Sequence, residues 1–145
     1  IDVGADCLQV FDSWGGILDQ GYEEFSLKFI NDIRAAIDPK IPLILYAKGM
    51  KIMLHLNATE INCFNLDQNE NIDEYINKPI TIQGNIDPND FNQDEEKVLA
   101  LAENIYEKYS QCENYVCNVG SGITPDIDPN KVGLFLQRLR VLNSK

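Results

Sequence analysis

Short apolar runs recur along the chain, each rich in branched and aromatic side chains. Runs of this length that end in polar or glycine clusters are typical of β-strands buried on both faces. The predicted strands are Cys7–Phe11, Pro42–Ala47, Ile61–Leu66, Ile80–Gln83 and Tyr115–Val119. The pattern therefore predicts five buried strands.

Between these runs the apolar positions change to a helical period. Segment Tyr22–Ile37 predicts an amphipathic helix that presents one apolar stripe to the core. Segment Asp94–Tyr109 repeats this pattern with Asp94 as its N-cap, and Asp128 followed by Pro129 predicts the start of a third helix. The connections 48–60 and 69–78 have room only for short helices. The stripe of the first helix consists of Tyr22, Phe25, Phe29, Ile33 and Ala36.

Strands and helices alternate without hairpin turns, which favours parallel strands joined by right-handed crossovers. The sequence therefore predicts an α/β fold and a single domain over residues 1–145. Five βα units fit either a small doubly wound sheet or an arc of an eight-stranded barrel, and periodicity alone leaves both open. No strand is followed by a GxGxxG turn, so we expect no dinucleotide site.

Polar residues gather where the predicted strands end, and ligands bind at the carboxyl ends of parallel strands. Candidate contacts at these ends are Lys48, Asp67, Gln83, Asn85 and Asn118. Each has a structural alternative: aspartates close βα turns by accepting backbone N–H groups, asparagines order loops, and a lysine stem packs at a rim. For Asp12, Asp67 and Asp87 we favour turn closure over acid–base chemistry.

Composition restricts the possible partners. The net charge of −11 and the absence of a basic patch argue against nucleic acid and anionic lipid, and no apolar run reaches the ~20 residues of a membrane span. The four cysteines lack CxxC spacing, which predicts reduced thiols in a reducing compartment, either the cytoplasm or the interior of a mitochondrion or plastid. We expect no metal and no cofactor. His55, the one histidine, is expected to be a packing or surface residue.

Several short sequence motifs occur in the order, and at nearly the spacing, that they have in a known protein family. The chain resembles the C-terminal portion of the uroporphyrinogen decarboxylase family. The resemblance implies a (β/α)₈ barrel whose fourth to eighth strands are present, and a cofactor-free enzyme, usually a homodimer, that converts uroporphyrinogen III to coproporphyrinogen III. The motifs are Gly4–Asp6, Phe11–Gly16, Glu24–Leu27, Ala47–Gly49, Asn65–Asp67, Gln83–Pro88 and Asn118–Ile123.

By this resemblance Phe11, Ser13 and Ser121 lie at the substrate cleft. Strand-end packing for Phe11 and turn capping for Ser13 are the alternatives. The chain departs from the family at Ser121, where the family has histidine, and at Gln68-Asn69, where it has Trp-Thr. A serine hydroxyl can hydrogen-bond but cannot act as a cation or general base near pH 7. The family's catalytic aspartate and its substrate-binding arginines belong to an N-terminal portion that this sequence does not include.

These deficits predict a protein that is non-catalytic alone and acts as a scaffold or interaction subunit. A protein partner would cover the open barrel edges, as a complementary half, a homodimer or a larger complex. Two alternatives stay open. The chain is the C-terminal part of a working decarboxylase that needs its N-terminal portion, or it is a small-molecule binding module that uses the cleft.

Overall fold

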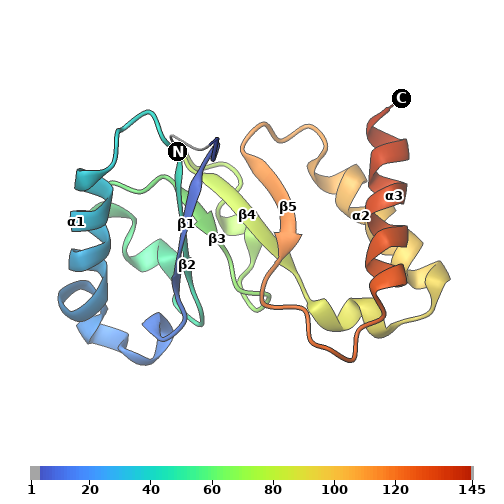
Figure 1. The fold of residues 1–145 in the computed structure, drawn as a ribbon, viewed down its shortest axis with the longest axis horizontal. Helices are drawn as coiled ribbons and strands as arrows, with labels where there is room; N and C mark the ends of the chain where they lie inside the picture. The colour runs from blue at the N-terminus through green and yellow to red at the C-terminus, as the bar shows by residue number, and fades with distance from the viewer. Residues whose placement is uncertain (1–3, 145) are drawn as a thin grey trace.

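The computed structural model describes residues 4–144, and its centre is a single parallel sheet (Figure 1). The five strands are hydrogen-bonded in the order β1-β2-β3-β4-β5, and every neighbouring pair is parallel. Their bounds are β1 (Leu8–Asp12), β2 (Leu43–Ala47), β3 (Cys63–Asn65), β4 (Thr81–Ile86) and β5 (Tyr115–Val119). The five predicted strands are all present: β5 has the predicted bounds, and the ends of the others differ by at most three residues.

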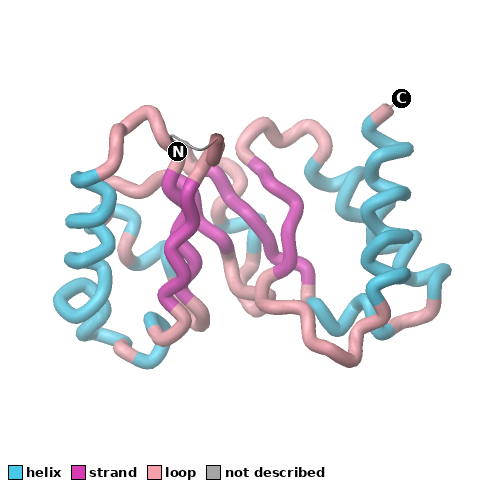
Figure 2. The backbone as a smooth tube through the Cα atoms, in the orientation of Figure 1, coloured by secondary structure: helices cyan, strands magenta, loops and turns pink. Residues whose placement is uncertain are grey.

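This strand order decides between the two predicted architectures. A doubly wound sheet reverses its direction of growth at a switch point, so some neighbouring strands are distant in sequence. Here each strand pairs with the next one along the chain, and right-handed crossovers then place all helices on one face. The sheet is therefore an arc of a (β/α) barrel. Figure 2 shows helices at both ends of the curved sheet, with strands between them.

Three α-helices cover the outer side of this arc, and short turns of helix fill the other connections. The long helices are α1 (Lys28–Ala36), α2 (Glu95–Tyr109) and α3 (Pro129–Asn143). The middle connections hold only 3₁₀ turns, Ile52–Leu54, Leu56–Ala58 and Ile72–Glu74, as predicted. Both predicted caps are confirmed: Asp94 accepts the Lys97 N–H at 3.1 Å, and Asp128 accepts the Asn130 N–H at 2.9 Å. No helix within residues 4–144 is long and apolar enough to cross a membrane.

Alternate strand residues point outward and form the core beneath the helices. Leu43, Leu45, Phe64 and Ile82 are almost completely buried there, together with Leu27. A second cluster joins the last two helices to the end of β4. It contains Ile86, Phe91, Val98, Ala102, Ile127 and Phe135.

The remaining strand positions point to the concave inner face of the arc, to which each strand contributes one polar side chain. Gln9, Tyr46, Asn65, Gln83 and Asn118 come from β1 to β5 in turn. In a complete barrel this face is enclosed by the other strands. Here it is open, and the carboxyl ends of the strands lie along one side of it.

The prediction that all five strands are buried on both faces is wrong for β1 and β5. Strand β2 is buried at every position, whereas β1 and β5 contain half-buried and exposed residues. Phe11 is 67% exposed and Val116 is 44% exposed. The reason is topological, because β1 and β5 are the two edges of an unclosed arc.

The predicted apolar stripe of the first helix is also wrong, apart from Tyr22. Leu27 and Ile30 make the buried face, whereas Phe25, Phe29 and Ile33 are 63%, 57% and 44% exposed. A π-helical segment, Glu23–Leu27, precedes α1 and changes the phase of the side chains along the segment. The three exposed residues therefore form an apolar strip that no described part of the chain covers.

Candidate functional site

A cavity of about 260 Å³ lies on the inner face, at the carboxyl ends of the strands. Its walls come from β1, β2, β3 and the end of β5, so segments far apart in sequence meet there. The lining residues are Gln9, Phe11, Tyr46, Asn65, Asn118, Val119, Ser121 and Gly122. Three of the sequence-predicted residues, Phe11, Asn118 and Ser121, are brought together in this cavity.

The floor of the cavity is a ladder of side-chain amides. Gln83 Nε2 donates to Gln9 Oε1 at 3.1 Å and to Asn65 Oδ1 at 2.6 Å. Asn118 Nδ2 donates to the same Asn65 oxygen at 3.1 Å. Asn65 and Gln83 are only 4% and 6% exposed, so this ladder satisfies polar groups that water does not reach. We call these four residues the amide ladder.

The ladder fixes which polar atoms are left for a ligand. Asn65 Oδ1 accepts two hydrogen bonds, Gln9 Oε1 accepts one, and Asn118 Oδ1 accepts the Val119 N–H at 2.9 Å. The free N–H donors are the Gln9 amide and the second hydrogen of Asn118, and the side-chain oxygens of both residues each keep one lone pair. The hydroxyls of Tyr46 and Ser121 add two more possible donors. The cavity is therefore suited to an acceptor such as a carboxylate oxygen, bound by neutral groups.

Tyr46 remains a donor throughout the neutral range. Burial raises the pKa of its phenol, and the negative charge of Asp67 raises it further. A raised phenol pKa keeps the proton on the oxygen. The Phe11 ring meets the Tyr46 ring edge-on, with centroids 5.8 Å apart, and gives the cavity an apolar side wall.

A close backbone contact positions the loop that carries Ser121. The Gly120 N–H donates to the Ile86 carbonyl at 2.8 Å. A Cβ on Gly120 would lie 2.3 Å from the Gln68 backbone nitrogen, so only glycine fits at this crossing. The loops after β3 and β5 therefore touch at the two places where the sequence departs from the family.

Two of the five predicted site residues that do not line the cavity are exposed. Ser13 is exposed and follows β1 at the open edge. Lys48 is also exposed, and its backbone carbonyl accepts the Gly16 N–H at 2.9 Å. Neither side chain lines the cavity. The arc thus brings together only part of the predicted set.

The polar residues after β3 and β4 order a loop. Asp67 is 4% exposed, and its Oδ1 accepts the Asn69 N–H at 3.0 Å. Asn85 Nδ2 donates to the carbonyls of Asp67 at 3.0 Å and Glu70 at 2.5 Å. These contacts match the structural alternatives for both residues. These bonds hold the short connection after β3, although the Gln68 side-chain oxygen in it is buried without a hydrogen-bond partner.

The other aspartates and the histidine have local partners too. Asp12 accepts the Ser26 hydroxyl at 2.5 Å, and Asp87 accepts the Asn89 N–H at 2.9 Å at the start of a 3₁₀ turn. His55 Nδ1 lies 2.9 Å from Glu23 Oε1, away from the cavity. Residues 4–144 contain no cluster of three or more His, Cys, Asp or Glu side chains that could hold a metal ion.

Sequence reasoning missed three of the polar lining residues, Gln9, Tyr46 and Asn65. The available signal was a polar residue within a run otherwise typical of a buried strand. Gln9 and Asn65 each interrupt such a run, and a buried amide requires a partner. Strand register, which the sequence does not supply, was needed to show that these amides meet.

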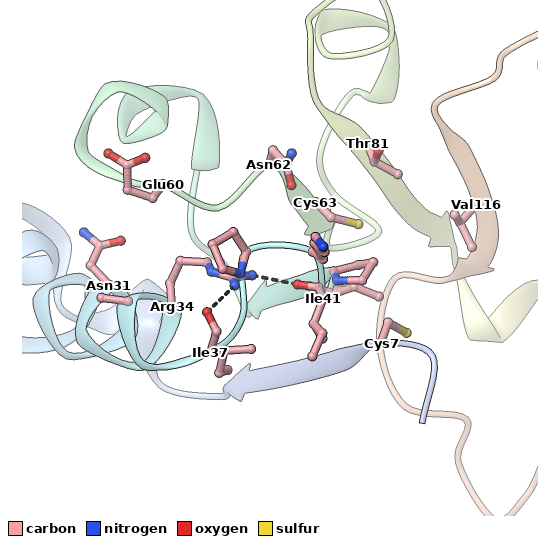
Figure 3. Close-up of a pocket in the computed structure, with 15 residues that line it drawn as sticks. Cys7, Asn31, Arg34, Ile37, Ile41, Glu60, Asn62, Cys63, Thr81 and Val116 are labelled. Carbon is pink, nitrogen blue, oxygen red and sulfur yellow. Dashed lines mark hydrogen bonds between the residues drawn. The ribbon is translucent and has the colours of Figure 1, made fainter. Parts of the chain in front are cut away.

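A larger cavity of about 740 Å³ lies at the opposite end of the sheet (Figure 3). One of its charged lining residues is Arg34, whose guanidinium donates to the carbonyls of Ile37, Asp38 and Ile41 at 2.8–2.9 Å. This arginine is used to hold the end of α1 and the following loop. In barrels the amino ends of the strands serve stability, and chemistry occurs at the other end. The smaller cavity is therefore the candidate site.

Comparison with known proteins shows to which protein family the chain is related. The family model described as "Uroporphyrinogen decarboxylase (URO-D)" matches residues 1–141. This chain belongs to the uroporphyrinogen decarboxylase family. Its relatives include the uroporphyrinogen decarboxylases of Hydrogenovibrio crunogenus, 34% identical, and Pseudoalteromonas translucida, 32% identical. Both alignments cover 100% of this chain and 44% of the relative.

The chain thus spans less than half the length of the uroporphyrinogen decarboxylases that it matches. A third relative, from Cellvibrio japonicus, is 33% identical with the same coverage, 100% of this chain and 44% of the relative. The family relationship and the five sequential parallel strands agree on a C-terminal portion of a (β/α) barrel. More than half of a family member therefore corresponds to nothing in these residues.

Proposed function

We propose that this chain is a uroporphyrinogen decarboxylase-like half-cleft that is non-catalytic by itself and acts as an interaction subunit of a larger assembly. The observation that carries the proposal is the open arc. The inner face holds one wall of a cavity, but no described residue stands opposite that wall. A reaction requires groups on both sides of its substrate, because positioning and charge stabilisation depend on enclosure.

Charge supports the same proposal. The family substrate carries many carboxylates, whereas this chain has a net charge of −11. No Lys, Arg or His side chain lines the candidate cavity, whose described walls are neutral. Neutral donors can orient one carboxylate but cannot offset several. A complementary subunit that brings cationic side chains would supply what this wall lacks.

A second candidate is a working decarboxylase formed when the remaining βα units join this chain. The amide ladder favours it. A degenerate cleft has no need to keep two buried and two half-buried amides in one hydrogen-bonded network beside a neutral polar surface. In this second function Phe11, Ser13, Ser121 and Asn118 would contact a tetrapyrrole, and Ser121 would donate a hydrogen bond where relatives use histidine.

Complementation tests both functions. The chain is assayed alone and mixed with the part of the Hydrogenovibrio crunogenus enzyme that precedes the matched region, and consumption of uroporphyrinogen III is followed by chromatography of the oxidised porphyrins. We expect no turnover by the chain alone and a stable but inactive mixed complex. Turnover by the chain alone overturns the proposal, and turnover by the mixture establishes the second candidate.

A pair of variants separates a missing residue from a missing subunit. Ser121→His restores an imidazole at the cavity, whereas Ser110→His places one at the exposed end of α2 and is the matched control. If the inactive complex gains turnover only with Ser121→His, the serine explains the inactivity. If neither variant gives turnover, the deficit is not confined to that position.

A further inference from the structure

An apolar strip consists of Phe25, in the π-helical segment Glu23–Leu27, and of Phe29 and Ile33 on α1, and we call it the α1 strip. Its members are 63%, 57% and 44% exposed, and they recur every four residues, so they lie along one side of the helix. Exposed apolar patches rimmed by polar residues mark interaction sites. Lys28 and Asp32, both exposed, lie next to the strip in sequence.

The opposite side of α1 faces the next βα unit. Asn31 Nδ2 donates to the Ala58 carbonyl at 2.8 Å, and Asn31 Oδ1 accepts the Thr59 hydroxyl at 2.9 Å. Both partners belong to the connection between β2 and β3. Phe29 and Ile33 each lie two positions from Asn31, and residues two apart point to opposite sides of a helix. The α1 strip therefore faces away from the next unit.

The α1 strip also faces away from the sheet. Leu27 and Ile30, at 1% and 5% exposure, make the contact with the core. In a barrel, a helix contacts the sheet on one face and its neighbouring helices on two sides. Asn31 marks the side of the following neighbour. The α1 strip is thus on the side where a preceding helix would lie.

The strand of the same unit is open in the same direction. Strand β1 is an edge of the sheet, and the turn that leaves it exposes Trp14 and Ile17 by 72% and 74%. Figure 1 shows α1 at the end of the molecule that carries β1. An unpaired strand edge beside an apolar helix side offers both parts of a βα contact surface.

We infer that the α1 strip is the docking surface for the helix of a βα unit that precedes β1, of the kind that makes up the unmatched part of the longer relatives. This rests on the proposed function, because it names the partner that completes the half-cleft. The alignments cover 44% of each relative, so ample chain for such units exists in the family. The occupant is an amphipathic helix that brings its own strand to the edge of β1.

A second copy of this chain fits the surface less well. Two copies would each carry a net charge of −11 and would repel one another at low salt. A symmetric contact between two α1 strips would also leave both β1 edges without a partner. A preceding βα unit covers the strip and pairs with the edge at the same time.

The test measures binding of the chain to the unmatched part of the Hydrogenovibrio crunogenus enzyme by titration with sedimentation analysis. Phe29→Ser removes the centre of the α1 strip. Leu54→Ser is the matched control, because Leu54 is 73% exposed and lies in the connection between β2 and β3, outside the α1 strip. We expect Phe29→Ser to weaken binding at least tenfold and Leu54→Ser to change it less than twofold.

The outcomes are distinguishable. If the wild-type chain binds and both variants bind equally well, the docking inference is overturned while the proposed function stands. If the chain alone forms a dimer that Phe29→Ser dissociates, a second copy is the occupant and the inference is again wrong. If the wild-type chain does not bind at all, the inference and the complementary-half form of the proposed function both fail. Circular dichroism should be unchanged in both variants, because both side chains are exposed.

Discussion

The amide ladder should hold the inner face together, and Asn65→Leu tests this. Leucine has nearly the size of asparagine, but it removes the oxygen that accepts from Gln83 at 2.6 Å and from Asn118 at 3.1 Å. It also removes the donation from Asn65 Nδ2 to the Leu66 carbonyl at 3.2 Å. The change therefore leaves buried polar groups unpaired without creating a cavity.

The expected magnitude follows from burial. Gln83 is 6% exposed, so its orphaned amide hydrogen costs about 1–3 kcal/mol, and the lost bond to Leu66 costs about 1 kcal/mol more. Asn118 lines the cavity, where water can replace the lost partner. Burial of the leucine side chain returns about 1–2 kcal/mol. The net loss in the free energy of unfolding is on the order of 1–2 kcal/mol.

Urea unfolding followed by circular dichroism measures this loss. Asn57→Leu is the control, because Asn57 is exposed and should shift stability by less than about 0.5 kcal/mol. Gln83→Met, combined with Asn65→Leu, should cost less than the two single changes added together, since it removes the orphaned hydrogen. Equal midpoints for Asn65→Leu and Asn57→Leu would refute the role assigned to the ladder.

Two further predictions concern the ends of the sheet. Gly120→Ala forces a Cβ to within 2.3 Å of the Gln68 backbone nitrogen and should destabilise the fold by about 1–3 kcal/mol. Gly122→Ala is the control, because a Cβ there has no atom within 4 Å and should not change stability. Thermal melting compares the two variants. Burial, and then the charge of Cys7, raises the pKa of Cys63 to about 11 from 9.0. Folded Cys63 therefore keeps its proton between pH 9 and 11 while the unfolded chain loses it, so this residue's contribution to stability falls as pH rises through that window. At pH 8, peptide mapping after thiol labelling should find Cys7 modified long before Cys63, and equal rates would contradict this.

The sequence was sufficient for the elements of the fold because its signals are local. Alternating apolar runs and helical periods identified five strands and three long helices, and Asp94 and Asp128 identified two helix starts from their own side chains. The closure of the sheet is not local. Periodicity could not separate a barrel arc from a doubly wound sheet, and strand order separated them.

The site was only partly predictable for the same reason. Phe11 and Ser121 were predicted from motifs shared with the family. Gln9 and Asn65 become functional candidates only when strand register brings their amides together. The prediction of a buried stripe on the first helix failed because amphipathic patterning identifies an apolar side without showing what covers it. Phe29 is apolar and exposed because its neighbour is not among these residues.

The strict succession of strands also bears on how such a protein can be divided. Every strand is paired with its neighbour in sequence, so no pairing inside this piece depends on residues from elsewhere. Cutting a sheet of this kind between two units breaks one strand interface and one helix interface at that point, and leaves all the others whole. The same rule makes the cut reversible in principle, as in repeat proteins whose units contact only their neighbours. A barrel wound in this order is modular, and these residues form a coherent module of it.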